Sequence, residues 1–191
     1  MPGAHSSELA RDLLGSARTF ASFLFTVCEQ QPLQKIAGGS LTLSQARILQ
    51  LVGISPGLTI HELAGCLNVT VAAAGQAVER LVQRGYLTRQ VKEEDRRSSK
   101  LNLTRSGRRL LDTYRSAQEA SLSEVMRRFS PGELRRATEI MDRLALALTE
   151  KLSAEGELCL ECGAFFRERC MIRGLSRKNC IHIHKPARRS A

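Results

Sequence analysis

Four of the six cysteines in this 191-residue chain lie in one short segment near its end. They are Cys159, Cys162, Cys170 and Cys180, in the spacing Cys-x2-Cys-x7-Cys-x9-Cys. Two cysteines separated by two residues can direct both sulfurs to one metal ion, and Gly163 permits the tight turn that frees backbone N–H groups to bond the thiolates. Four thiolates complete a tetrahedral zinc site or bind the irons of an iron–sulfur cluster. The segment is therefore predicted to bind a metal.

The spacing does not identify the metal by itself, but it favours an iron–sulfur cluster over Zn2+. Zinc ribbons usually repeat the Cys-x2-Cys pair, whereas the second half of this segment has two isolated cysteines. Irregular spacing is common around iron–sulfur clusters, and Phe165 and Phe166 would shield a cluster from water. A metal-free thiol switch ranks third. His182 and His184 are spare ligands if one cysteine does not bind.

The positive charge of the chain is concentrated in two segments. The net charge is +10, and residues 80–109 hold ten Lys or Arg against three acidic residues. Residues 151–191 hold nine against four. Such a basic surface suits a polyanionic partner, with nucleic acid first and an anionic membrane surface second.

Composition narrows the class of protein. An apolar content of 42% can build a core. The chain has no apolar run of membrane-spanning length and no basic-then-apolar start typical of a secretory signal, so we expect a cytoplasmic protein with no membrane partner. Thiols stay reduced there, which favours a metal or redox role for the cysteines over structural disulfides. No nucleotide-binding loop or catalytic triad is evident, so an enzyme is not expected.

Apolar residues recur at spacings of three and four near the start of the chain, which predicts an amphipathic helix. They are Leu9, Leu13, Ala17, Phe20, Leu24 and Val27. Pro32 and the pair Gly38-Gly39 are expected to mark its end. A second helix is expected over 43–51, with Thr42 or Ser44 as its cap.

The next two helices have the pattern of a helix-turn-helix. Thr59 and Glu62 have the spacing of a capping box, and 68–70 is a short break. A second helix follows, with Val71, Ala74, Val78, Leu81 and Val82 as its expected apolar face. Gly85 lies where a left-handed cap is needed. The second helix of such a motif typically enters the major groove of DNA.

A β-hairpin and two long helices complete the predicted order. The β-prone runs YLTRQV and KLNLT flank the charged segment EEDRRSS, which is expected to be a loop with a basic tip. Thr104 is the expected cap of a long helix carrying Leu110, Leu111, Tyr114, Val125, Met126 and Phe129. Ser130-Pro131-Gly132-Glu133 forms a further capping box, which begins the last long helix.

The hairpin carries the pattern D-x-R-x-x-x-L-x-L-T, formed by Asp95, Arg97, Leu101, Leu103 and Thr104. RLVQRGYL precedes it, SGRRLL follows it, and FSPGEL joins the two long helices. On these residues the chain resembles the MarR family of bacterial transcriptional regulators over roughly Leu9–Leu152. The resemblance implies a mainly α fold with a small β-hairpin wing, that is, a winged helix-turn-helix with a helical dimerisation region. The expected domains are 1–152, with a DNA-binding core at about 41–104, and a Cys-rich tail at 153–191.

The resemblance also implies a homodimer on double-stranded DNA, with an inverted-repeat operator and interlocking first and last helices. It places a recognition helix at 70–84 and a wing arginine, Arg97 or alternatively Arg96, in the minor groove, where Asp95 would brace it. A narrow groove concentrates negative potential, so an arginine there gains both attraction and shape readout.

The outward face of the expected recognition helix is poor in hydrogen-bonding groups at its N-terminal end. Gln76 can contact adenine through two hydrogen bonds, and small alanines can pack on thymine methyls. We therefore expect modest base readout, with phosphate contacts carrying much of the affinity. The candidate DNA-binding residues are Thr70, Ala72, Ala73, Gln76, Arg80, Arg84, Arg96, Arg97 and Lys100, with Gln83 on the same face.

The leading hypothesis is a dimeric, sequence-specific transcriptional regulator that responds to redox state or to metal or iron–sulfur status through the four cysteines. One alternative is a regulator that binds a small aromatic or organic-acid effector between its DNA-binding and dimerisation regions, with a purely structural zinc-bound tail. Another is a zinc-stapled protein-interaction module with incidental DNA binding. The remaining cysteines, Cys28 and Cys66, are expected to be small core residues.

Overall fold

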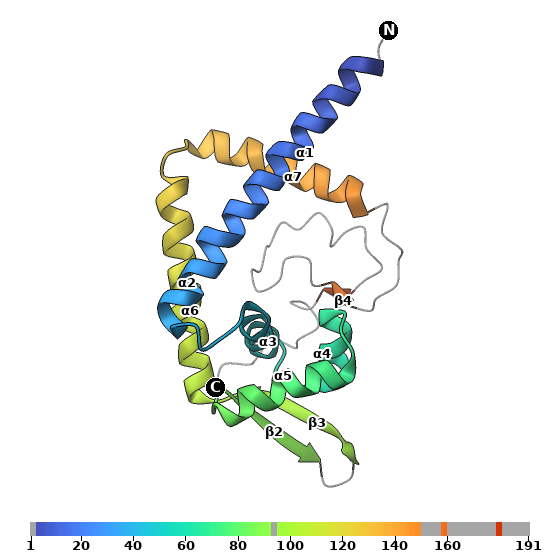
Figure 1. The fold of residues 1–191 in the computed structure, drawn as a ribbon, viewed down its shortest axis with the longest axis vertical. Coiled ribbons are helices and arrows are strands. Elements are labelled where there is room, and N and C mark those ends of the chain that lie inside the picture. Colours follow the sequence, from blue (N-terminus) through green and yellow to red (C-terminus); the bar gives the residue numbers. More distant parts are fainter. Residues whose placement is uncertain (1–2, 93–94, 150–157, 160–178, 181–191) are drawn as a thin grey trace, which may run out of the picture.

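The computed structural model describes residues 3–92, 95–149, 158–159 and 179–180, and only the backbone at 3–6, 91–92, 95–98, 149, 158–159 and 179–180. In this part of the chain the elements run α1, η1, α2, α3, β1, α4, α5, β2, β3, α6 and α7, with the short strands β4 (Leu158–Cys159) and β5 (Asn179–Cys180) beyond α7. Figure 1 shows a unit of α3, α4, α5 and the wing strands at one end, from which α6 leads away. The fold is mainly α with a small antiparallel sheet, as predicted.

The first helical segment is longer than predicted. α1 (Gly3–Phe25) passes into one turn of π-helix, η1 (Thr26–Gln30), and continues as α2 (Gln31–Ala37). The expectation that Pro32 ends the helix is therefore wrong, because Pro32 lies in the first turn of α2, where its missing N–H is tolerated. Gly38 does end the segment, in the left-handed conformation with a φ of 53°.

Three helices begin with the reciprocal hydrogen bonds of a capping box. They are α3 (Leu43–Ile54), α4 (Ile60–Leu67) and α7 (Pro131–Thr149), which follow Thr42, Thr59 and Ser130. In each, the cap hydroxyl accepts an N–H three residues ahead, and the side chain there accepts the N–H of the cap. Such a cap stabilises a helix by about 1 kcal/mol. The boxes at Thr59 and Ser130 were predicted from the sequence, and Thr42 is the one of the two predicted cap candidates that caps α3.

The wing is a three-stranded antiparallel sheet with the order β1-β3-β2. Its strands are β1 (Leu58–Thr59), β2 (Leu87–Lys92) and β3 (Asp95–Leu103). β2 and β3 form the predicted hairpin, but the predicted loop EEDRRSS is too long, because β3 already begins at Asp95. β1 was not predicted, since two residues carry no alternating pattern; it pairs with β3 at Leu101 and Lys100.

The core joins α3, α4, α5 (Val71–Gln83) and the sheet. Its largest fully buried side chains are Ile48, Leu49, Leu51, Val52, Leu63, Val78, Leu81, Leu87 and Leu101. Full burial of one such side chain contributes about 1.5–3 kcal/mol relative to its exposure. α2 adds Leu33, which is 4% exposed, and so fastens the first helical segment to this unit.

α6 (Arg105–Met126) and α7 leave the core and are more exposed. Phe129 was expected on the long helix, but α6 ends at Met126 and Phe129 lies in the turn before α7. Among the described helices, none is long and apolar enough to cross a membrane.

α6 begins in close contact with the chain segment that follows α5. The Thr104 hydroxyl donates to the Gly85 carbonyl at 2.6 Å, and the Thr104 N–H donates to the Tyr86 carbonyl at 3.0 Å. The same hydroxyl oxygen accepts the N–H of Gly107 at 2.9 Å. Gly107 is buried, and a Cβ at this position would overlap the Tyr86 carbonyl oxygen. The first turn of α6 therefore requires glycine for lack of space.

We predict that Gly107→Ala lowers the free energy of unfolding by about 2–4 kcal/mol, because the new methyl group must displace backbone. Gly65→Ala is the matched control, since Gly65 is an exposed residue of α4 with open space around its Cβ position. It should raise stability by about 0.5–1 kcal/mol through helix propensity. Urea unfolding followed by circular dichroism measures both, and equal midpoints would contradict the contact at Tyr86.

Candidate nucleic-acid interface

The turn between α4 and α5 is held by backbone conformation and by one cap. Asn68 ends α4 in the left-handed conformation, with a φ of 52°, and its N–H donates to the carbonyls of Ala64 and Gly65. Thr70 then caps α5, and its hydroxyl oxygen accepts the Ala73 N–H at 3.2 Å. Thr70, a candidate DNA-binding residue, thus has a structural task, although its hydroxyl also carries a donor hydrogen.

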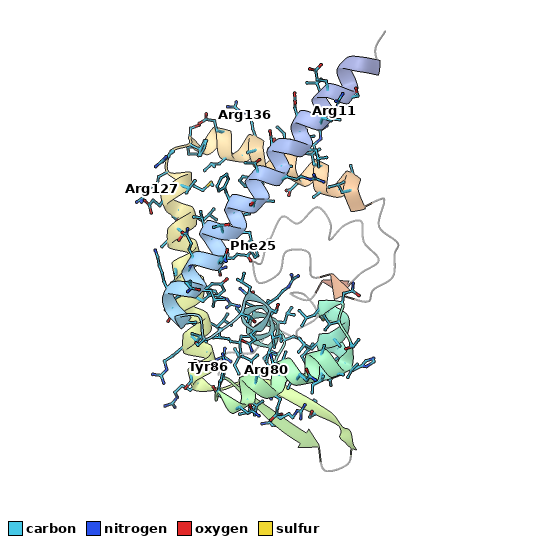
Figure 2. The ribbon with its side chains drawn as sticks, viewed as in Figure 1. Arg11, Phe25, Arg80, Tyr86, Arg127 and Arg136 are labelled. Carbon is cyan, nitrogen blue, oxygen red and sulfur yellow. The ribbon has the colours of Figure 1, made fainter. Side chains whose placement is uncertain are left out.

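The two faces of α5 are clearly separated. Ala74, Val78 and Leu81 are at most 1% exposed and pack into the core. The candidate residues of the opposite face are all exposed: Ala72, Ala73, Gln76, Arg80, Gln83 and Arg84. Figure 2 shows Arg80 on α5 beside the wing strands. The predicted outward face is therefore exposed and free to contact a ligand as large as a DNA duplex.

Two features of this face were missed in the sequence. Val71 was placed on the apolar face of the predicted helix, yet it is 48% exposed, and Val69 in the preceding turn is 45% exposed. Two apolar side chains at the start of α5 can contact thymine methyl groups. Glu79 is also exposed, and the Gln83 Nε2 donates to its Oε1 at 3.5 Å. A carboxylate on this face disfavours close approach of a phosphate. The hydrogen bond between Gln83 and Glu79 could not be inferred from the sequence alone.

The wing places Lys100 in the central strand. Lys100 pairs with Thr59 of β1 and with Gln90 of β2, and its side chain is exposed. Its Cδ lies close to the backbone of Gly57, 3.6 Å from where a Cβ would be. Lys100 therefore bears its ammonium group on the central strand of the same three-stranded sheet that forms the wing.

The backbone of Asp95, Arg96 and Arg97 lies in β3 and not in a loop. Lys92 pairs with Asp95 while Val91 pairs with Ser99, so β3 has extra residues at this point and the hairpin is irregular there. The side chains of 91–98 lie outside the described residues, and the proposed bracing of Arg97 by Asp95 stays a prediction.

The predicted metal ligands lie mostly outside the described part of the chain. Cys162, Cys170, His182 and His184 are in undescribed segments. Cys159 and Cys180 end β4 and β5, which pair in parallel with these two residues opposite each other. Among the side chains that the structure describes, no group of three or more His, Cys, Asp or Glu is placed to bind a metal.

The other two cysteines are free thiols whose environment disfavours ionisation. Burial raises the pKa of the Cys28 thiol, and the nearby Glu29 carboxylate adds to the effect. Burial and Glu62 likewise raise the pKa of Cys66. Since the thiolate is the reactive form, neither cysteine has the environment of a redox sensor.

Part of the chain matches the model of a known protein family. Residues 40–98, from the turn before α3 into β3, match the model of the MarR family. HTH-type transcriptional regulator BilQ of Clostridium symbiosum (strain WAL-14163) is 24% identical over 137 residues, which cover 72% of this chain and 89% of BilQ.

Two solved structures show the same fold. YusO protein from Bacillus subtilis superposes with a TM-score of 0.62 at 21% identity, covering 74% of this chain and 97% of YusO. FabT of Streptococcus pneumoniae, solved in complex with DNA, has a TM-score of 0.62 at 19% identity and covers 73% of this chain and 99% of FabT. Residues 40–98 thus match the MarR family model, and the solved structures show that the chain shares their winged helix-turn-helix fold.

We predict that Gln76→Ala relaxes base preference at one position of the DNA site by about 1–3 kcal/mol and leaves affinity for random DNA nearly unchanged. Gln76 is an exposed side chain of α5, and its amide has both an acceptor oxygen and a donor NH2, which suit adenine. Competition binding with a library varied one base pair at a time measures the effect. A uniform loss across all sequences would mean that Gln76 positions the helix and reads no base.

Proposed function

We propose that this protein is a dimeric, sequence-specific DNA-binding transcriptional regulator that recognises an inverted repeat. The observation that carries the proposal is the face of α5. A rigidly capped helix presents exposed Gln76, Arg80 and Arg84 on one side while its other side is anchored in the core. This is the arrangement by which a recognition helix enters the major groove.

The surface charge around α5 supports DNA as the ligand. Exposed basic side chains lie on α5, the wing strands and the first turns of α6: Arg80, Arg84, Arg89, Lys100, Arg105, Arg108 and Arg109. Lys and Arg gain affinity for DNA by neutralising phosphates and releasing counterions. The basic side chains that would attract DNA phosphates therefore lie on or next to the helix that would enter the major groove.

A second copy of the chain is the proposed partner of the exposed apolar surface on α1 and α7. Leu9, Phe23 and Leu148 are 67%, 66% and 68% exposed in a single chain. Further large apolar side chains are exposed on the same two helices: Leu13, Leu14, Phe20, Leu24, Phe25, Ile140, Met141 and Leu144. Exposed apolar surface on this scale marks an interaction site. A dimer through these helices would cover it and would place two α5 helices on one DNA.

The signal is proposed to act through Cys159, Cys162, Cys170 and Cys180, which would bind an iron–sulfur cluster or, as the alternative, Zn2+. The pairing of β4 with β5 supports this, because it brings the first and last of the four cysteines to adjacent strands, about 4.7–4.9 Å apart in a sheet. Four thiolates around a metal would order the segment that follows α7. Since α7 belongs to the proposed dimer surface, metal binding to this segment would change the relative orientation of the two subunits.

A small aromatic or organic-acid effector is the second candidate signal, and α6 offers the observation that favours it. The Arg115 Nε and the Gln118 Oε1 are buried and have no hydrogen-bond partner among the described residues. They lie three residues apart on one helix, and such positions share a face. A buried donor and acceptor without partners cost about 1–3 kcal/mol each. A phenol or a protonated carboxylic acid bound between them would recover both, because its hydroxyl donates to the Gln118 Oε1 and its oxygen accepts from the Arg115 Nε.

A substitution in the wing tests the proposed function. Arg97→Ala should weaken binding to the specific site and to random DNA alike, and should reduce the slope of log affinity against log salt by about 1. The measurement is fluorescence anisotropy on an inverted-repeat promoter site and on a scrambled duplex at several salt concentrations. Arg136→Ala on α7 is the control, because it removes an equal charge away from α5 and the wing. Wild-type protein that binds both duplexes equally would refute sequence-specific regulation.

The cysteine cluster has its own test. Cys162→Ser should abolish metal retention and change operator affinity, while the protein stays folded and dimeric. Cys66→Ser is the matched control, since it removes a thiol from α4 and leaves the tail intact. Metal and acid-labile sulfide are measured on protein purified without oxygen: iron and sulfide together indicate a cluster, and one zinc per chain indicates Zn2+. If Cys162→Ser loses metal but binds the operator as wild type does, with and without oxygen, the cluster is not the switch.

A further inference from the structure

The π turn η1 has a cause in the sequence. In a regular α-helix the ring of Pro32 would meet the carbonyl of Cys28, four residues earlier, and its missing N–H would leave that carbonyl without a partner. Here the turn widens instead, and the Gln31 N–H donates to the Thr26 carbonyl, five residues back. Single π turns inside α-helices are rare, and those that occur are often found at functional sites.

The wide turn decides which faces of α1 and α2 are aligned. Cys28, Pro32 and Leu33 are all buried, Cys28 and Leu33 at 9% and 4% exposure, and Leu33 follows Cys28 by five residues. In an α-helix such positions point about 140° apart, whereas one five-residue π turn places them on the same side. Leu24 precedes Cys28 by four residues and so shares its face. The apolar stripe of α1 therefore continues directly into the core-facing side of α2.

Tyr114 fastens this turn to α6. Its hydroxyl donates to the Glu29 carbonyl of η1 at 3.2 Å, and its side chain is 3% exposed. Burial, with a contribution from the Glu29 charge, raises the pKa of Tyr114 to about 12, so the phenol keeps its proton throughout the neutral range. α6 begins at Thr104 against the end of α5. The hydrogen bond thus connects the rotation of α1 to the DNA-binding unit.

We propose that η1 and Tyr114 are a positioning device: the π turn accommodates one extra residue, so that the stripe of α1 that faces the partner subunit stays aligned with the core face of α2. Tyr114 holds that alignment relative to α5. The inference rests on the proposed dimer and adds to it the element that sets the orientation of the two subunits, and with it the separation of their recognition helices. That separation has to match the spacing of the half-sites.

Two single-residue deletions test the alignment. Both deletions are made together with Pro32→Ala, so that no proline ring meets the carbonyl four residues back. Deletion of Gln30, an exposed residue of η1, then turns the bond between Gln31 and Thr26 into a regular α-helical one and preserves the faces. Deletion of Ala21, an exposed residue of α1, rotates the preceding stripe by about 100°. Sedimentation equilibrium should therefore give a dimer dissociation constant within about threefold of wild type for the first variant and at least tenfold weaker for the second. Equal effects of the two deletions, whether both harmless or both severe, would overturn the proposal.

Tyr114→Phe tests the fastening, and also covers the case in which a deletion prevents folding. It removes only the hydroxyl, whereas the control Thr113→Val removes a neighbouring hydroxyl that bonds within α6. Operators with half-sites one base pair closer or farther apart should be discriminated about three- to tenfold less well by Tyr114→Phe and unchanged by Thr113→Val. Unaltered spacing preference in Tyr114→Phe would overturn the role of Tyr114. Because dimerisation is measured without DNA, failure of wild type to bind any operator would count against the proposed function alone.

Discussion

The close approach of α6 to the Gly85 and Tyr86 carbonyls is the constraint on which the rest of the structure depends. α5 ends there, β2 of the wing begins there, and the long helix α6 that leads toward α7 starts there. Thr104 satisfies both carbonyls, and the absence of a side chain at Gly107 provides the space. Because buried backbone polar groups must be paired, the contact has few alternative geometries. It therefore holds α5, the wing and α6 as one body.

The parts of the fold that could be predicted from the sequence are those fixed by neighbouring residues. A Ser or Thr followed three residues later by Glu or Gln determines a helix start through two hydrogen bonds within four residues, which is why Thr59 and Ser130 were found. The buried side of α5 was predicted for the same reason, because its spacing follows the helix period. The exposed candidates Gln76 and Arg80 then follow as the remainder of that helix.

What could not be predicted depends on contacts distant in the chain. Val71 fits the apolar period of α5, yet it lies at the helix start beyond the reach of the core, and it is exposed. β1 exists only because β3 provides the pairing for its two residues. The π turn has a local cause in Pro32, but proline can equally end a helix. Burial of Leu33 in the core, far along the chain from its partners, kept the segment helical.

The proposed signals and the positioning device act on one quantity, the separation between two α5 helices in a dimer. The cysteine segment follows α7, and η1 sets the rotation of α1. The buried atoms of Arg115 and Gln118, which lack a hydrogen-bond partner among the described residues, lie on α6, between α5 and α7 in the chain. None of these has to touch DNA to alter affinity, because α5 and the wing move with α6 as one body. Because α5, the wing and α6 form a rigid unit, a small change in the angle between two subunits changes the separation of their α5 helices. That separation then no longer matches the half-site spacing. The tight junction at Tyr86 is thus what would make regulation from a distance effective.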